Sequence, residues 1–157
     1  MQGFQPGLFD RLADDDTHIH ALRRRSRSAE AEACRESITR DLMALLNTRA
    51  NVSALALTSL PGVSASVINY GLIDFAGMCM TSDTDQQKIC TAVQEAIQRH
   101  EPRLQKVDVA LSPKKGAINR VEFMITAELK SGLSTQPMAF NAVFRPSLQQ
   151  YSIDDAT

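Results

Sequence analysis

The spacing of apolar residues predicts two amphipathic helices. Between Ala29 and Arg49, and again from Thr84 to the residues before Pro102, apolar side chains recur every three or four positions, the repeat of a helix that buries one face. Thr84 opens a T-x-x-Q capping box, and Pro102 ends the second helix because proline disfavours helical backbone in the preceding residue. The two buried stripes are expected to comprise Cys34, Ile38, Leu42, Leu45 and Leu46, and then Ile89, Val93, Ala96 and Ile97.

Between the two predicted helices, the sequence predicts only short elements. Val52–Leu57 is consistent with a short strand and Ser64–Tyr70 with a brief helix. Gly71 follows that helix directly, where glycine favours the left-handed conformation that ends helices. The face of the first helix opposite its apolar stripe is polar, and we expect solvent to cover its residues Arg35, Glu36, Arg40 and Asp41.

Beyond Pro102 the pattern changes to alternation of apolar and polar residues, which is typical of strands with one buried face. The alternating segments run from Lys106 to Ser112, from Arg120 to Lys130 and from Met138 to Arg145. Short connectors containing glycine and proline favour an antiparallel meander. The sequence therefore predicts an α+β fold in which two main helices pack on a small, mainly antiparallel β-sheet.

The length of the chain predicts one domain. It has 157 residues, of which 43% are hydrophobic, enough for a single buried core. We expect this domain to occupy residues 28–150, with residues 151–157 as a tail.

Residues 1–27 differ in composition from the rest of the chain. Runs of aspartate and arginine leave little apolar content, so we expect a mobile, partly disordered N-terminal arm. Within it, Leu8, Phe9 and Leu12 lie at helical spacing. A segment so short is not a stable helix alone, which makes residues 8–12 a candidate docking segment.

Charge and cysteine content exclude several classes of protein. The 17 Lys and Arg residues against 18 Asp and Glu residues give a net charge of −1, so a dedicated binder of nucleic acid or anionic membrane is not expected. No apolar run approaches the roughly 20 residues of a membrane span, and no signal-peptide pattern is present. Three cysteines without paired spacing fit a reducing, cytoplasmic compartment. No phosphate-binding glycine motif occurs and His18-x-His20 lacks a third ligand, so we expect neither cofactor nor metal.

The tripeptide Glu101-Pro102-Arg103 is the most distinctive chemical pattern. Proline fixes the turn out of the second helix, and residues i and i+2 of an extended segment project to the same side. The carboxylate and the guanidinium can therefore pair with each other or with charges on a partner. By spacing alone, the corner is more often structural than functional.

Two further functions stay open at this point. Glu101 is the best candidate acid for a muramidase, but glycoside hydrolysis needs a second carboxylate at about 5–9 Å. None is tied to Glu101 in the sequence, and a neighbouring arginine favours the ionised carboxylate, which cannot donate a proton. The other function is phosphate or nucleic-acid binding by an arginine run without interleaved aromatic residues, Arg23, Arg24, Arg25 and Arg27.

Three segments together resemble the signature motifs of one protein family. Residues 40–49 (RDLMALLNTR) resemble R-D-L-x-x-L-L-N-T-R, residues 66–75 (SVINYGLIDF) resemble S-V-x-N-Y-G-L-P-D-L, and residues 101–104 resemble an E-P-R-L corner. The family is that of the TssE baseplate subunits of type VI secretion systems, which are similar to the lysozyme-like baseplate wedge protein of contractile phage tails. The matching signature residues are Arg40, Asp41, Asn47, Arg49, Asn69, Tyr70 and Gly71.

This resemblance implies a non-enzymatic structural subunit that links baseplate wedge subunits and initiates sheath polymerisation. The implied partners are the baseplate subunits TssF, TssG and TssK and the sheath subunits TssB and TssC, in a cytoplasmic baseplate at the inner membrane of a Gram-negative bacterium. Sheath subunits of such tails exchange strands, so an available sheet edge would be a docking surface. The candidate assembly residues are Glu101, Pro102 and Arg103, together with Leu8, Phe9 and Leu12.

Overall fold

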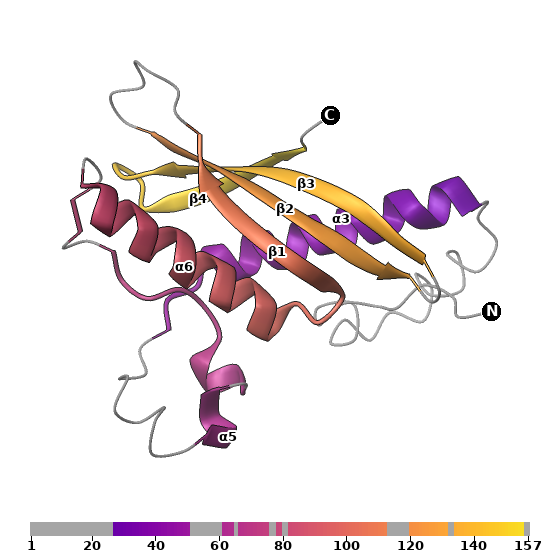
Figure 1. Ribbon diagram of the computed structural model, residues 1–157, viewed down its shortest axis with the longest axis horizontal. Helices are drawn as coiled ribbons and strands as arrows, with labels where there is room; N and C mark the ends of the chain where they lie inside the picture. The colour runs from indigo at the N-terminus through magenta and orange to yellow at the C-terminus, as the bar shows by residue number, and fades with distance from the viewer. Residues whose placement is uncertain are drawn as a thin grey trace.

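Two long helices and a four-stranded sheet make up most of the described chain (Figure 1). The helices are α3 (Arg27–Leu46) and α6 (Asp83–His100), with the short α5 (Pro61–Ser64) and the 3-10 helix η1 (Val67–Asn69) between them. The strands are β1 (Leu104–Leu111), β2 (Val121–Ser131), β3 (Ser134–Arg145) and β4 (Gln150–Asp155). The expected α+β fold is confirmed. The structure is a computed structural model and describes residues 27–50, 61–64, 66–75, 78–79, 82–112, 120–131 and 134–155.

The sheet is an antiparallel meander with the strand order β1-β2-β3-β4. The three predicted strands are present, and the apolar residues of their alternating patterns face the core. The fourth strand is a correction, because the expected tail after residue 150 instead pairs with β3 along its length. In this strand only Tyr151 and Ile153 are large and apolar, which is too short an alternation to predict a strand from sequence.

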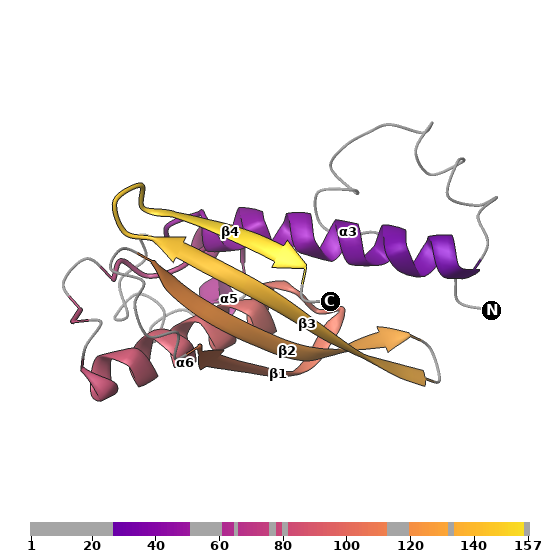
Figure 2. The ribbon, with the colours of Figure 1, turned by 90° about the horizontal axis from the view of Figure 1, so that it is seen from above.

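Both helices direct their apolar stripes into the same core as the inner face of the sheet. Figure 2 shows α3 on the β4 side of the sheet and α6 on the β1 side. All the predicted stripe residues are buried or packed against the core. The N-terminal cap of α6 is Ser82 rather than Thr84, since the Ser82 side chain accepts a hydrogen bond from the Asp85 backbone N–H.

Two residues expected on the solvent face of α3 turn inward. Asp41 is only 5% exposed, and Arg35 lies over the Phe140 ring with its guanidinium carbon 5.7 Å from the ring centroid. The expected helix over Ser64–Tyr70 is replaced by two shorter turns, α5 and η1.

Several expectations lie outside the described residues. These are the N-terminal arm with its docking residues Leu8, Phe9 and Leu12, the strand over Val52–Leu57, and the pair His18 and His20. Within the described part of the chain, no helix is long and apolar enough to cross a membrane.

Candidate assembly site

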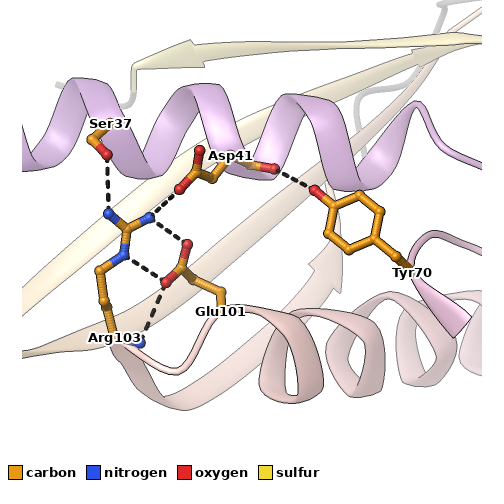
Figure 3. A network of polar contacts seen from close by, with 5 residues as sticks. All are labelled: Ser37, Asp41, Tyr70, Glu101 and Arg103. Carbon is orange, nitrogen blue, oxygen red and sulfur yellow. Dashed lines mark hydrogen bonds and ion pairs between the residues drawn. The ribbon is translucent and has the colours of Figure 1, made fainter. Parts of the chain in front are cut away.

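Glu101 and Arg103 pair with each other in the interior of the domain (Figure 3). Arg103 donates from Nε to Glu101 Oε1 at 2.7 Å and from Nη2 to Glu101 Oε2 at 2.6 Å, so both carboxylate oxygens accept from one guanidinium. The side chains are about 5–6% exposed. The sequence left open whether these two charges pair with each other or with charges on a partner. In the structure they pair with each other.

Helix α3 completes this arrangement from the other side. Arg103 Nη2 also donates to Asp41 Oδ2 at 2.6 Å, and Nη1 donates to Ser37 Oγ at 3.0 Å. Ser37 and Asp41 are four residues apart and so share one face of the helix, the face turned to the corner after α6 (Figure 3). We call Ser37, Asp41, Glu101 and Arg103 the buried network. It joins α3 to the junction of α6 and β1 through a single guanidinium.

The carboxylates of the buried network stabilise the ionised form of Arg103. Burial alone would lower the pKa of Arg103, but its hydrogen bond to Glu101 and the negative charges of Glu101 and Asp41 outweigh burial and raise that pKa. A guanidinium so placed keeps its charge at every pH at which the protein is folded. The network therefore holds two carboxylates around one permanent cation.

The second signature segment reaches the same network through Tyr70. Its hydroxyl donates to the Asp41 backbone oxygen at 3.5 Å, and burial, with smaller contributions from Asp41 and Glu101, raises the pKa of Tyr70 to about 12. The phenol therefore stays protonated as a donor. Beside it, His100 Nε2 lies 3.0 Å from the backbone oxygen of buried Asn69, and the His100 ring packs edge-on against Tyr70. The end of α6 is thus bound to η1 and to Tyr70, which follows it.

Gly71 permits a close crossing of two backbone segments. Leu72 N donates to Thr48 O at 2.8 Å and Ala50 N donates to Leu72 O at 2.9 Å, a parallel bridge between the end of α3 and the segment after η1. Gly71 has φ +121°, and a Cβ atom there would lie 2.4 Å from Thr48 O. The glycine is needed for this contact, and not as the left-handed end of a helix that the sequence predicted.

Asn47 binds the end of α3 to the last strand, and Arg49 contacts residues before that strand and after η1. Asn47 Nδ2 donates to Tyr151 O at 3.0 Å, and Tyr151 N donates to Asn47 Oδ1 at 2.8 Å. Arg49 contacts Asp74 at 2.7 Å and Gln149 Oε1 at 3.0 Å. Arg40, the first signature residue of this segment, is exposed.

The remaining candidate residues are placed differently. Pro102 is exposed, and its backbone oxygen accepts a hydrogen bond from Lys130 Nζ at 2.9 Å. Leu8, Phe9 and Leu12 lie outside the described residues. The structure therefore brings Glu101 and Arg103 together with signature residues of α3 and of the segment after η1, but it turns them inward instead of toward a partner.

The buried network is poorly suited to glycoside hydrolysis. Asp41 supplies a second carboxylate near Glu101, which the sequence did not reveal, but both acids bind the same guanidinium. A general acid must be protonated and must reach its substrate. Glu101 is only 4% exposed and both of its carboxylate oxygens accept hydrogen bonds from Arg103, so neither oxygen is placed to donate a proton to a substrate. Among the described residues, no cluster of three metal-ligating side chains occurs.

The sequence did not predict three features of this site. These are the role of Ser37, the pairing of Asp41 with Arg103, and the contact of Asn47 with Tyr151. A signal for the first two is present in α3, because Ser37 and Asp41 lie beside Ile38 and Leu42 on the helical surface. Polar residues that border the apolar stripe of a helix can be buried with it, and buried polar groups make hydrogen bonds. No comparable signal marks Asn47.

The fold and the buried network define the class of protein: a small structural α+β module in which three separate sequence segments lock the helices to the sheet. The chain belongs to the family of the baseplate wedge protein gp25, which matches residues 32–132, well over half of the chain. Membership of this wedge family, expected from the signature motifs, is confirmed.

Comparison with individual proteins adds one similar structure. A search of curated proteins finds no match. Among solved structures, a chain in "The baseplate complex from the type VI secretion system" is 18% identical, with 73% of this chain and 97% of that chain covered and a TM-score of 0.46.

Proposed function

We propose that this protein is a TssE-type subunit of a type VI secretion baseplate. In this role it links the wedge subunits TssF, TssG and TssK and starts polymerisation of the TssB–TssC sheath, on the cytoplasmic side of the inner membrane of a Gram-negative bacterium. Membership of the baseplate wedge family supports a structural baseplate role. The three signature segments support the type VI assignment by their resemblance to TssE.

The observation that carries the proposal is the convergence of those segments on one buried network. Asp41 comes from the first segment, Tyr70 from the second and Glu101 with Arg103 from the third. Their polar groups are used on one another, within the fold. A rigid structural subunit needs such internal fastening, whereas a catalytic centre needs polar groups that face a substrate.

A projecting apolar surface supports contact with other wedge subunits. Val67, Ile68 and Ile73 are 74%, 64% and 48% exposed, and Figure 1 shows the segment that contains α5 extending away from the helices and the sheet. Neighbouring exposed apolar side chains are typical of protein interaction sites. We assign the contact with TssF and TssG to this surface and to the docking segment Leu8–Leu12 of the N-terminal arm.

Capture of purified subunits tests the proposal. Tagged full-length protein is expected to retain TssF, TssG and TssK, and to increase the rate at which TssB–TssC forms sheath. Val67→Asp combined with Ile68→Asp should weaken capture of TssF and TssG while thermal unfolding stays unchanged, because both residues are exposed. Leu148→Asp is the matched control, since Leu148 is 59% exposed in the turn before β4.

The arm is tested in the same assay. Deletion of residues 1–26, or Leu8→Asp with Phe9→Asp, should also weaken capture and leave the thermal unfolding of the core nearly unchanged. Full capture by the deletion variant would show that the arm does not contribute to the contact with TssF and TssG. Failure of the unaltered chain to retain any baseplate subunit or to affect sheath formation would overturn the proposal as a whole.

A further inference from the structure

The 3-10 helix η1 is an internally hydrogen-bonded turn that presents two apolar side chains to solvent. The Ser66 side chain caps it by accepting a hydrogen bond from the Ile68 backbone N–H at 3.3 Å. Asn69 N donates back to Ser66 O at 3.1 Å. Tyr70 N donates to Val67 O at 3.2 Å, which closes the turn. Val67 and Ile68 therefore move together with η1, and the orientation of η1 decides where they project.

The two exposed side chains of η1 are stiff. Val67 and Ile68 are both β-branched, and two heavy atoms on Cβ restrict rotation about χ1. Such side chains lose little freedom when a partner covers them, so the main entropic cost of docking lies in ordering the backbone that carries them. The strength of a contact through Val67 and Ile68 therefore depends on how firmly η1 is held to the domain.

Two hydrogen bonds hold η1 to the long helices. From α6, His100 Nε2 lies 3.0 Å from Asn69 O, and because a carbonyl oxygen can only accept, Nε2 carries the hydrogen of this bond. On the other side, the Tyr70 hydroxyl reaches Asp41 O of α3 at the longer distance of 3.5 Å (Figure 3). Of the two, the bond from His100 is shorter and is made to the residue directly after Ile68.

His100 is itself held at a fixed place in the domain. It is the last residue of α6, between the fully buried Ile97 and Glu101 of the buried network. The Glu101 backbone N–H donates to Ile97 O at 2.8 Å, and the His100 ring packs edge-on against Tyr70 with ring centroids 5.3 Å apart. The hydrogen bond to Asn69 O therefore connects η1 to a well-packed part of the core.

We propose that His100 is a positioning residue for docking, and that its hydrogen bond to Asn69 O holds η1 in the orientation in which Val67 and Ile68 enter an apolar recess of the TssF–TssG pair. This inference rests on the proposed function, which assigns contact with TssF and TssG to the surface of η1. His100 acts through Asn69 and does not itself contact the partner. Because Val67 and Ile68 project from a turn, the partner surface that receives them is concave and apolar.

Two amide variants of His100 separate this hydrogen bond from the other properties of the residue. The side-chain nitrogen of glutamine lies as many bonds from Cβ as Nε2 of histidine, whereas that of asparagine lies one bond nearer. His100→Gln can therefore still donate to Asn69 O, and His100→Asn is too short to do so. Both variants lack the imidazole ring and its titration, so they form a matched pair.

Titration of the full chain with the purified TssF–TssG pair measures the effect on docking. His100→Asn should weaken binding by about tenfold, because the apparent affinity falls with the fraction of molecules in which η1 has the docking orientation. His100→Gln should restore binding to within about twofold of the unaltered chain. Val109→Ala is the control for a general loss of stability, since it removes buried apolar atoms from β1, opposite Ile125, and should not change binding.

Hydrogen–deuterium exchange of the isolated proteins tests the positioning of η1 without a partner. The amides of Asn69 and Tyr70, which close η1, should exchange faster in His100→Asn than in His100→Gln. The amides of β2 and β3 should exchange alike in both variants, because the sheet does not depend on this bond.

The outcomes distinguish failure of this inference from failure of the proposed function. Equal binding by His100→Asn and His100→Gln, an equal loss of binding in Val109→Ala, or unchanged exchange of Asn69 and Tyr70 in His100→Asn would overturn the positioning role and leave the proposed function intact. Failure of the unaltered chain to bind TssF–TssG would overturn the proposed function and this inference with it.

Discussion

At the scale of single residues, Arg103 is the centre of the buried network. It makes hydrogen bonds to Glu101, Asp41 and Ser37, all from the interior. Removing a charge from water is expensive, and the attraction between buried ions offsets that expense only when their hydrogen bonds are complete. Among the described residues, Arg103 is in contact with both carboxylates, Glu101 and Asp41. Loss of the cation is therefore more serious than loss of either acid.

This asymmetry predicts the order of stability of three variants. Arg103→Gln should lower the free energy of unfolding by about 3–5 kcal/mol, because it removes the cation that both buried carboxylates contact. Glu101→Gln should lower it by less, since Arg103 keeps Asp41 as a partner. Glu95→Gln should change it by at most about 0.5 kcal/mol, because Glu95 meets Arg99 only at the surface, at 3.9 Å. Urea unfolding measures all three, and equal losses for Arg103→Gln and Glu95→Gln would contradict the account.

At the scale of elements, the helices are held to their neighbours by polar contacts at their ends as well as by apolar packing. The end of α3 bonds to the segment after η1 and to β4, and the end of α6 bonds to η1. These contacts position the segment that carries the exposed Val67, Ile68 and Ile73. A change at a crossing point should therefore affect stability although no apolar group is lost.

Gly71 is such a crossing point, and Gly62 provides a matched comparison. Gly71→Ala should lower the free energy of unfolding by at least about 2 kcal/mol, because the new Cβ would collide with Thr48 O in a positive-φ conformation. A Cβ at Gly62 would have no neighbour within 4 Å, so Gly62→Ala in α5 should be neutral or slightly stabilising. Thermal unfolding of the two variants compares them directly, and similar effects would show that the crossing is not tight.

His100 makes the contact between α6 and η1 sensitive to pH. Burial lowers the pKa of His100, more than its contact with Asn69 O raises it. The unfolded chain, with a histidine pKa of about 6.5, therefore binds a proton at a higher pH than the folded chain does. The contribution of His100 to the free energy of unfolding is complete above about pH 6.5, the pKa of histidine in the unfolded chain. It is lost as the pH falls through the lower pKa of His100 in the folded chain.

His100→Gln should therefore flatten the fall in stability on acidification. Glutamine keeps an N–H donor for Asn69 O but does not titrate. Urea midpoints measured between pH 7 and pH 5 on both proteins test this, and the two remaining histidines cancel in the comparison. Parallel pH profiles would show that His100 does not carry the dependence.

At the scale of the whole molecule, the architecture favours assembly over catalysis. The polar side chains of Asp41, Glu101 and Arg103 point into the domain, while some apolar side chains and the strand edges lie on its surface. Such an arrangement leaves surfaces available to other proteins. It buries Glu101, the residue that the sequence suggested as a candidate general acid.

The purified protein should accordingly not cleave peptidoglycan. Glu101 is enclosed and its two carboxylate oxygens both accept from Arg103, so neither oxygen is placed to donate a proton to a glycan. Turbidity of a peptidoglycan suspension should match that of a buffer blank. Clearing by the unaltered chain that disappears with Glu101→Gln would contradict this prediction and support the muramidase alternative.

The sequence by itself determined which faces of the elements are buried. Helical and alternating periodicities placed the stripes of α3 and α6 and the inner face of β1, β2 and β3, because burial of one face imposes its period on the residues. The corner Glu101-Pro102-Arg103 was likewise visible, since a carboxylate and a guanidinium two residues apart are local neighbours.

Only the tertiary structure decided what lies beside those residues. Arg103 meets Asp41 across 62 positions of the chain, and Asn47 meets Tyr151 across 104. Neither contact has a local pattern, because the partners are brought together by packing of the helices on the sheet. The short strand β4 depends on the same packing, because β3 and the side chain of Asn47 satisfy its backbone groups. Its own alternation of apolar and polar residues is too short to predict a strand from sequence.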